Sequence, residues 1–563
     1  MRCASIKIGI AIILVLSGPA AKGQTPSNTE LGQVRQEMGQ LKQEYEQMSQ
    51  AYAERLRKLD ERLKQLEKTS PQPELVSAAM VSSSRPAPAV IAETATPAHQ
   101  TSSQSDGQAA PAQTIPEDPT DSIQLALGQQ QNNPVREKME TVLQNFVDVT
   151  GYFRAGYGRD DEGGPQVGFQ APGALAKGRL GNEAENYEEL AFSKNFYLPG
   201  AFSLTRNSAG GPSTAPVARF LLRMSMYNPY QNYNSSSDTT FGIAEAWGAV
   251  GNLTPSQPSM NVWAGNRFYR RHDIHINDFF IYNISGGGGG VEDIKLPFGK
   301  IALAWIGIGS LSGFSDIPQP IPENKAGFNK GNFDFRLYDV RMLGGLGEFG
   351  LDVSHATSGH DQAGNSAPNA TGVSFTFIHT AEKWAGENNM NKFYLQYGHG
   401  PAKTFTSGFE TYAVNGVSFI RPDAPGSYRF RVADNMIFET GNHFSVSPVV
   451  LYQATDYKQY GGQQYWFSAG VRPQVHFNDY FSVAVEPFVD WTDDRSTNIS
   501  DYLFKFTFAP QVSLGRHFMS RPAIRAFVTY AQWGNGFKGQ IGGPDYVNST
   551  QGLMWGAQME SWW

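Results

Sequence analysis

Hydrophobic and polar residues alternate along the chain from about residue 148 onward. A period of two is the pattern of a β-strand, whose successive side chains point to opposite faces. Residues 521–530 repeat it, with Ile524 and Val528 opposite Arg521 and Arg525. In residues 149–157 one face carries Val149, Gly151, Phe153, Ala155 and Tyr157, and the other carries Thr150, Tyr152, Arg154 and Gly156. The pattern therefore predicts an all-β region that extends to the C-terminus.

The C-terminal residues 553–563 distinguish a membrane barrel from a soluble sandwich, which would also alternate. This segment has the length that a tilted transmembrane strand needs. It places Trp555 and Trp563 on one face and Gln558, Glu560 and Trp562 on the other. An exposed aromatic edge strand would invite aggregation in a soluble protein. Closing it against the first strand removes that edge, as lipid requires, so we predict a transmembrane β-barrel.

The N-terminal part of the chain has different patterns. Apolar and aromatic residues in 28–68 recur at alternating spacings of three and four, with a stutter at Tyr52. This spacing is typical of a coiled coil, which we assign to residues 24–68; a single amphipathic surface helix is the alternative. Residues 69–133 are rich in Pro, Ala, Ser, Thr and Gln and favour a disordered linker. The predicted barrel domain is residues 134–563.

The first 23 residues have the layout of a secretory signal peptide. Arg2 and Lys7 precede the apolar residues 8–16, and small residues follow at 19–23. That apolar run is too short to span a membrane as an uncleaved anchor, and no later run of about 18 apolar residues exists. The only cysteine, Cys3, lies inside the signal, so the mature chain is expected to lack disulfides and thiolate metal sites.

Composition agrees with a barrel. Hydrophobic residues make up 40% and charged residues 17% of the chain, with 59 glycines and 36 phenylalanines. The net charge of -7 gives no basic footprint for nucleic acid. We therefore expect outer-membrane lipid, rather than nucleic acid, as a partner of the barrel.

Five stretches of the sequence resemble the maltoporin (carbohydrate-selective porin) family. They are residues 151–154, 179–183, 263–275, 520–525 and 556–563, and they occur in the family's order. The resemblance implies an 18-stranded antiparallel barrel, a homotrimer, and a third loop that folds inward to narrow the pore. The predicted coiled coil resembles the N-terminal extension of the sucrose porins. Eighteen strands of about ten residues with their loops need on the order of 400 residues, which the barrel region supplies.

The resemblance also implies a path of aromatic residues for sugar rings. Tyr152 and Tyr187 on early strands and Trp562 on the last strand match this slide. Met519, with Phe518 beside it, and Met390 stand where the family has slide aromatics. Methionine offers an apolar, polarizable contact but no flat face. Tyr230 or Tyr233 is the candidate for an aromatic that reaches the neighbouring subunit's pore.

The polar residues that would contact sugar hydroxyls, which we call the polar track, match the family more completely than the aromatic residues do. Arginine and carboxylate groups can grip neighbouring hydroxyls through charge-assisted hydrogen bonds. A constriction arginine is missing near Ala244, a tyrosine is replaced by Phe280, and an aspartate by Asn283, which predicts a less charged throat. The matching positions around the constriction are Arg154, Arg179, Glu189, Arg271, Asp273, His275 and Asp278.

Other motifs suggest no further chemistry. His272 and His275 fall on opposite faces of an extended chain, which disfavours a shared metal. The Gly-rich residues 286–290 lack the Gly-Lys-Ser/Thr of a phosphate loop, and we expect them to let the third loop bend inside the barrel. Ser520 has no Gly-x-Ser-x-Gly elbow around it. We therefore expect no cofactor, no metal and no enzyme activity.

The sequence favours an outer-membrane porin that passes maltose, malto-oligosaccharides, sucrose or related sugars by facilitated diffusion. A general diffusion pore is one alternative. A structural tether or adhesin is the other, because the N-terminal extension would lie in the periplasm, where it could contact peptidoglycan.

Overall fold

The computed structural model describes residues 147–197, 216–228, 239–310, 328–360, 366–414 and 417–563. The predicted signal peptide, coiled coil and linker lie outside these residues, as do residues 134–146 of the predicted barrel domain and both Tyr230 and Tyr233. Within the described ranges, no helix has the length and apolar character needed to cross a membrane.

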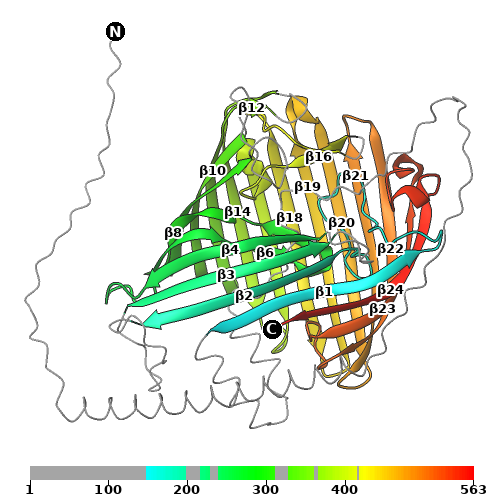
Figure 1. Cartoon of the computed structure of the whole chain (residues 1–563), viewed down its shortest axis with the longest axis horizontal. Coiled ribbons are helices and arrows are strands. Elements are labelled where there is room, and N and C mark those ends of the chain that lie inside the picture. Colours follow the sequence, from blue (N-terminus) through cyan, green and yellow to red (C-terminus); the bar gives the residue numbers. More distant parts are fainter. Residues whose placement is uncertain (1–146, 198–215, 229–238, 311–327, 361–365, 415–416) are drawn as a thin grey trace, which may run out of the picture. The chain divides into compact units, whose positions relative to one another are not determined.

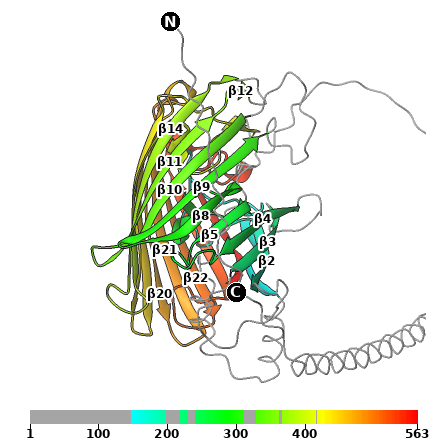
Figure 2. The ribbon, with the colours of Figure 1, turned by 90° about the vertical axis from the view of Figure 1, so that its left-hand side faces the viewer.

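Eighteen antiparallel strands form one closed sheet, in which each strand pairs with its neighbours along the chain (Figure 1). Closure requires the strands to tilt, and the tilt is visible in the side view (Figure 2). The wall strands are β1 (Asp148–Asp160), β2 (Asn186–Tyr197), β3 (Val217–Asn228), β4 (Thr240–Gly251), β5 (Asn261–Arg267), β8 (Gly286–Leu296), β9 (Gly299–Ser310), β10 (Phe328–Met342), β11 (Gly345–Ala356), β14 (Ala370–Glu382), β15 (Met390–His399), β18 (Tyr428–Thr440), β19 (Phe444–Asp456), β20 (Gln463–His476), β21 (Phe481–Asp494), β22 (Ile499–Ser513), β23 (Ala523–Trp533) and β24 (Gln551–Trp562).

The first and last strands close the barrel, as the sequence predicted. Tyr152 of β1 stands opposite Trp562 of β24. The backbone N–H groups of Gly151 and Trp563 donate to each other's carbonyl oxygens at 3.0 and 3.1 Å. A Cβ built on Gly151 would lie 2.4 Å from the Trp563 ring, so glycine is what lets this ring cover the seam.

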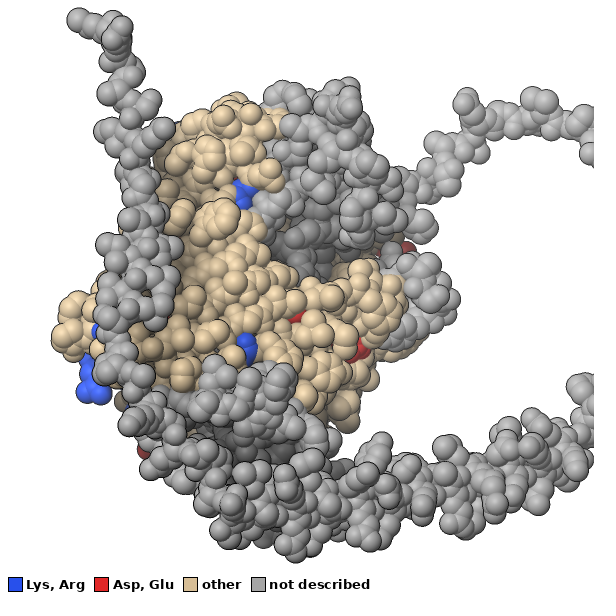
Figure 3. Space-filling view, turned by 60° about the vertical axis from the view of Figure 1, so that its left-hand side comes forward, with Lys and Arg blue, Asp and Glu red and all other residues tan. Residues whose placement is uncertain are grey.

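The predicted alternation holds in the wall. Val149 and Tyr157 are 44% and 49% exposed on the outside, whereas Tyr152 and Arg154 are buried on the lumen side. Across the barrel, exposed Phe, Val and Leu lie outward and buried Arg, Glu and Asp lie inward. One outer face is almost free of Lys, Arg, Asp and Glu (Figure 3). This apolar outside with a polar inside is the arrangement of a barrel surrounded by lipid.

The two ends of the barrel differ in their connections. At the end that holds Asp148 and Trp562, two-residue turns link β8 to β9 and β10 to β11; we call it the turn end. The opposite, loop end carries the long connections 161–185 (loop 1), 268–285 (loop 3) and 400–427. Short elements lie within them: β6 (His272–Ile274), η2 (His275–Asn277) and β7 (Phe279–Tyr282) in loop 3, and η3 (Gly400–Thr404), β16 (Thr411–Val414) and β17 (Val417–Ile420) in 400–427.

The remaining short elements lie in other connections. These are β12 (Gly359–His360), β13 (Ser366–Ala367), η4 (Lys458–Tyr460), η5 (Asn535–Phe537) and η6 (Pro544–Tyr546).

Loops 1 and 3 fold into the lumen and bond to its walls. The Leu180 N–H of loop 1 donates to Glu486 on β21 at 3.0 Å. In loop 3, the Asn277 amide donates to Ser468 on β20 at 3.2 Å, and the Tyr282 hydroxyl donates to Asp334 and Asp352 at 3.0 Å each. The inward third loop implied by the family resemblance is therefore present.

The expectation for the glycine run was wrong. Gly286–Gly290 do not form a bend of loop 3 but begin wall strand β8, paired with β5 and β9. The alternation puts Gly290 on the lumen side opposite Trp263, where a Cβ would lie 2.9 Å from the indole Nε1. Glycines in this strand make room for large inward side chains of the neighbouring strand.

Candidate functional site

The predicted slide aromatics come together in the lumen. Tyr152 and Tyr187 form one apolar cluster, with ring centroids 6.1 Å apart. Partly exposed Trp562 packs against them, as do Tyr227, Phe268 and Phe280. We call these six residues the slide cluster. Phe280, predicted at the constriction, therefore belongs to the aromatic surface itself.

The two predicted slide tyrosines are covered rather than open. Tyr152 is 1% exposed and Tyr187 is 2% exposed. Their hydroxyls are fixed by hydrogen bonds, from Tyr152 to Glu560 at 3.2 Å and from Tyr187 to Glu189 at 2.5 Å. A solute would therefore meet Trp562 and the other partly exposed rings first, with the tyrosines supporting them.

The two methionines assigned to the slide lie apart from this cluster. Met519 is 38% exposed in the connection between β22 and β23, whereas its neighbour Phe518 is buried, with its ring centroid 6.4 Å from that of His275. The structure thus places Phe518, rather than Met519, toward the lumen. Met390 begins β15 and packs against the main buried cluster.

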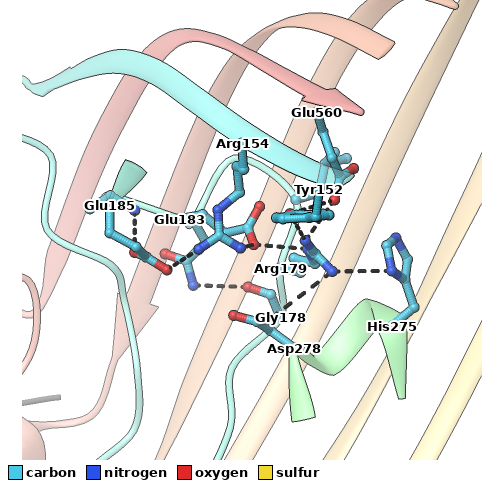
Figure 4. Close-up of polar contacts among 12 residues, drawn as sticks. Tyr152, Arg154, Gly178, Arg179, Glu183, Glu185, His275, Asp278 and Glu560 are labelled. Carbon is cyan, nitrogen blue, oxygen red and sulfur yellow. Dashed lines mark hydrogen bonds and ion pairs between the residues drawn. The ribbon is translucent and has the colours of Figure 1, made fainter. Parts of the chain in front are cut away.

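Loop 1 supplies carboxylates that hold the predicted arginines (Figure 4). Arg154 is fully buried and pairs with Glu183 and, at 2.5 Å, with Glu185. Arg179 pairs with Glu183 at 2.8 Å, so Glu183 bridges both guanidinium groups. Burial raises the pKa of Glu183 to about 7, while the charges of Arg154 and Arg179 act to lower it.

Glu560 of β24 connects several arginines in the lumen. Arg179 donates to it at 2.6 Å, Arg521 at 2.7 and 2.9 Å, and Arg525 at 3.0 Å. It is 1% exposed. The strand alternation predicted that Glu560 points inward. Because Glu560 is two residues from Trp562 on the same strand face, the sequence could have assigned it to this site.

Arg223 of β3 extends the track. It donates to Glu189 at 2.9 Å and to Glu245 at 2.6 Å. Arg271 instead stacks on Phe268 at 3.5 Å and on Phe280 at 4.6 Å from the ring centroids. Among the described residues, the Arg271 guanidinium has no hydrogen bond or ion pair, so it remains available to a solute oxygen.

Polar residues of loop 3 contact arginines of loop 1 and of the connection between β22 and β23, and a tyrosine of β15. Arg179 Nη1 lies 3.1 Å from His275 Nδ1, and Arg521 Nη2 lies 3.3 Å from Nε2. Burial, with the charges of Arg179 and Arg521, holds the pKa of His275 well below its usual range. Asp278 lies 4.0 Å from Arg179, and the Asp273 carbonyl accepts from the Tyr394 hydroxyl at 3.2 Å.

The arrangement joins flat rings to a network of donors and acceptors. Arg521 lies 4.2 Å from the Trp562 ring centroid, and His275 meets the ring edge-on at 6.1 Å. Such a surface suits a solute with both apolar faces and hydroxyl groups. Within the described ranges, no group of His, Cys, Asp or Glu side chains could hold a metal ion.

Sequence reasoning missed several members of this site. Tyr227 and Arg223 share the inward face of β3, and Glu245 of β4 stands opposite Arg223, but none of the three lies in a stretch that resembles the family. Glu183 lies within such a stretch, four residues after Arg179, and that spacing was a usable signal. Glu185 became visible only through its contact with Arg154.

The chain matches several solved structures at low sequence identity. The anion-selective porin from Comamonas acidovorans matches at 10% identity, with 74% of this chain and 99% of that chain covered and a TM-score of 0.34. OpdK of Pseudomonas aeruginosa, solved with vanillate, matches at 10% identity over 74% and 98%, with a TM-score of 0.37. Wzi of Escherichia coli, described as a carbohydrate-binding β-barrel involved in capsule assembly, matches at 13% over 77% and 91%, with a TM-score of 0.36.

The family comparison covers the whole described barrel. The model of the LamB porin family matches residues 147–563, which is most of the chain and includes every strand of the wall. The chain therefore belongs to the LamB porin family and is an outer-membrane porin.

Proposed function

We propose that this porin carries neutral di- and oligosaccharides, such as maltose, malto-oligosaccharides or sucrose, across the outer membrane by facilitated diffusion. The observation that carries the proposal is the slide cluster lying against an arginine and carboxylate network, with Trp562 bounded by Arg521 and His275. A pyranose ring has C–H faces for the aromatic rings and a rim of hydroxyls for the charged groups. No cofactor and no catalysis are part of the proposal.

The charges around the cluster favour a neutral solute over a free anion. Arg154, Arg179 and Arg223 each pair with at least one carboxylate, so most of their charge is compensated. Paired charges still donate and accept hydrogen bonds. They offer a sugar many weak contacts, which matches the requirement that conduction needs binding followed by release.

Planar-bilayer recordings test this function. We expect maltose, sucrose or a related sugar to block the ion current in a saturable manner. Replacing Trp562 by Ala should weaken the block about tenfold, because a large partly exposed ring is lost from the path. Phe153→Ala is the matched control, since Phe153 lies on the opposite face of its strand from Tyr152. If no sugar blocks and small anions and cations pass alike, the pore is a general diffusion pore.

We further propose that the porin is a homotrimer and that its N-terminal extension lies in the periplasm, where it can act as a tether. Deletion of residues 24–133 tests the role of the extension. Normal insertion and unchanged sugar block would leave it a tether or trimer clamp, whereas lost sugar flux with normal insertion would give it a role in transport.

A further inference from the structure

A register shift in β4 turns Trp247 into the lumen. Arg223 pairs with Glu245 and Met224 with Ile243, so Ala244 is skipped in the pairing with β3. An extra residue reverses which face the following side chains occupy. Ile243 is 63% exposed on the outside, whereas Glu245 is 3% exposed on the inside, and Trp247 shares the face of Glu245 and packs against the main buried cluster.

Trp247 is set among charged groups of the neighbouring strands. The Arg267 guanidinium lies 4.3 Å from its ring centroid and that of Arg219 lies 5.8 Å away. The indole Nε1 donates to Glu245 at 3.1 Å, and Arg267 donates to Glu292 at 2.8 Å. A Cβ on Gly265, whose φ is +130°, would lie 2.4 Å from the Ala246 carbonyl oxygen and 2.7 Å from the Trp247 Cβ, so this glycine lets β4 and β5 approach closely at Trp247.

This group continues the slide cluster toward the turn end. Glu245, which accepts from Trp247, also accepts from Arg223, and Arg223 donates to Glu189 beside Tyr187. On β3, Tyr227 stands opposite Tyr187, and Leu221 stands opposite Trp247. Their separation of six positions corresponds to about 20 Å along the strand. Glu245 also accepts from the backbone N–H of Phe268 at 2.8 Å, so the group adjoins the slide cluster at Phe268 and extends it away from Tyr187.

Two buried donors beside the group lack acceptors. Trp263 Nε1 and the Tyr269 hydroxyl have no hydrogen-bond partner among the described residues. Their rings stack at 5.3 Å, and Arg267 lies 5.0 and 5.8 Å from their centroids. Both donor atoms are buried, so a solute would meet the partly exposed Trp247 and Arg267 rather than these two donors.

We propose that Trp247, Arg267, Glu245 and Glu292 form a second carbohydrate subsite, which receives a pyranose ring on the turn-end side of Tyr187 and Tyr227. The inference rests on the proposed sugar transport and adds to it. Glu292 pairs with Arg267 and Glu245 accepts from the Trp247 indole, so the site suits a neutral sugar better than an anion. Because it extends the aromatic surface beyond Phe268, it is a contact for longer oligosaccharides and for sugars that arrive from the turn end.

Current block by maltose and by maltohexaose, added to either side of a pore inserted in one orientation, tests the subsite. We expect Trp247→Ala to lower the binding constant of maltohexaose about fivefold, with most of the loss in the association rate from the turn-end side. Trp247→Phe should retain part of the affinity. Trp305→Ala is the control, because Trp305 is 58% exposed on the outside of β9, and it should behave as wild type.

The outcomes separate this inference from the proposed function. The subsite is overturned if sugars block the Trp247→Ala pore from both sides as strongly as they block the wild-type pore. If the Trp562→Ala pore is blocked more weakly in the same recordings, the proposed sugar transport still stands. Absence of block in the wild-type pore would overturn both. Unchanged single-channel insertion and heat-modifiable gel mobility show that the variants are folded, and if Trp247→Ala does not fold, Arg267→Gln takes its place with the same expected loss.

Discussion

Glu560 is the single carboxylate that receives Arg179, Arg521 and Arg525, and Glu560→Gln keeps its shape while removing its charge. Arg179 retains Glu183 at 2.8 Å, and Arg525 retains Gln511 at 3.0 Å. Arg521 retains only the Ser520 carbonyl oxygen and the His275 ring among its described hydrogen-bond partners. The substitution therefore leaves one buried guanidinium poorly compensated.

The expected loss of stability follows from the acceptors that each arginine keeps. Breaking a buried ion pair by removing one partner costs about 3–5 kcal/mol, and the two arginines that keep other acceptors place this variant near the lower limit. We expect the free energy of unfolding to fall by about 3 kcal/mol, measured by urea titration of the barrel in lipid vesicles. The lumen also gains one positive charge, so the reversal potential in a KCl gradient should shift toward chloride.

Two further variants complete the experiment. Glu387→Gln removes a carboxylate that is 82% exposed and pairs with Lys383 at 2.7 Å; it should change stability by less than about 1 kcal/mol. Adding Arg521→Gln to Glu560→Gln should recover part of the loss, because the two side chains are coupled. A Glu560→Gln barrel as stable as wild type, with unchanged ion selectivity, would show that Glu560 does not compensate the charges of these arginines.

Three other predictions concern loop 1, β8 and loop 3. The pKa of Glu183 is about 7 in the folded barrel, whereas its usual value is 4.5, so the folded barrel binds this proton more tightly than the unfolded chain does. The proton therefore adds stability as pH falls from about 7 to 4.5, by at most about 3 kcal/mol. Urea titrations at pH 8 and pH 5 should show this gain in the wild type and its loss in Glu183→Gln. Gly290→Ala should destabilise the barrel by about 1–3 kcal/mol, because its Cβ would lie 2.5 Å from the Leu303 carbonyl oxygen. Gly287→Ala is the control, since its Cβ would meet nothing within 4 Å, and it should leave the urea titration unchanged. Tyr282→Phe removes the donor shared by Asp334 and Asp352 and should loosen loop 3, seen as noisier single-channel current; a trace as quiet as wild type would contradict this anchoring role.

Much of the fold and part of the site could be predicted from the sequence. Alternation with period two placed Tyr152 and Arg154 inward and Tyr157 outward, and their burial confirms this. The same alternation placed Glu560 inward and Trp563 outward, and the terminal strand predicted closure. The family resemblance brought loop 3 into the lumen.

Other features depended on contacts between residues distant in the chain. Arg179 and Glu560 are 381 positions apart, and no local pattern predicts their pairing. Phe518 rather than Met519 turns inward because the connection between β22 and β23 is not a strand, so strand alternation does not apply there. The glycines 286–290 were predicted to bend a loop, yet their neighbours β5 and β9 hold them in the wall.

Within each strand, the sequence alone predicts which side chains face lipid and which face the lumen, because the strand period is local and any one-residue slip would reverse it. Where the alternation is interrupted, and which inward side chains contact one another, became clear only from the tertiary structure. The register shift at Ala244 turned Trp247 inward, and barrel closure brought Glu560 to three arginines. Both depend on how strands pair across the sheet, which no single strand encodes.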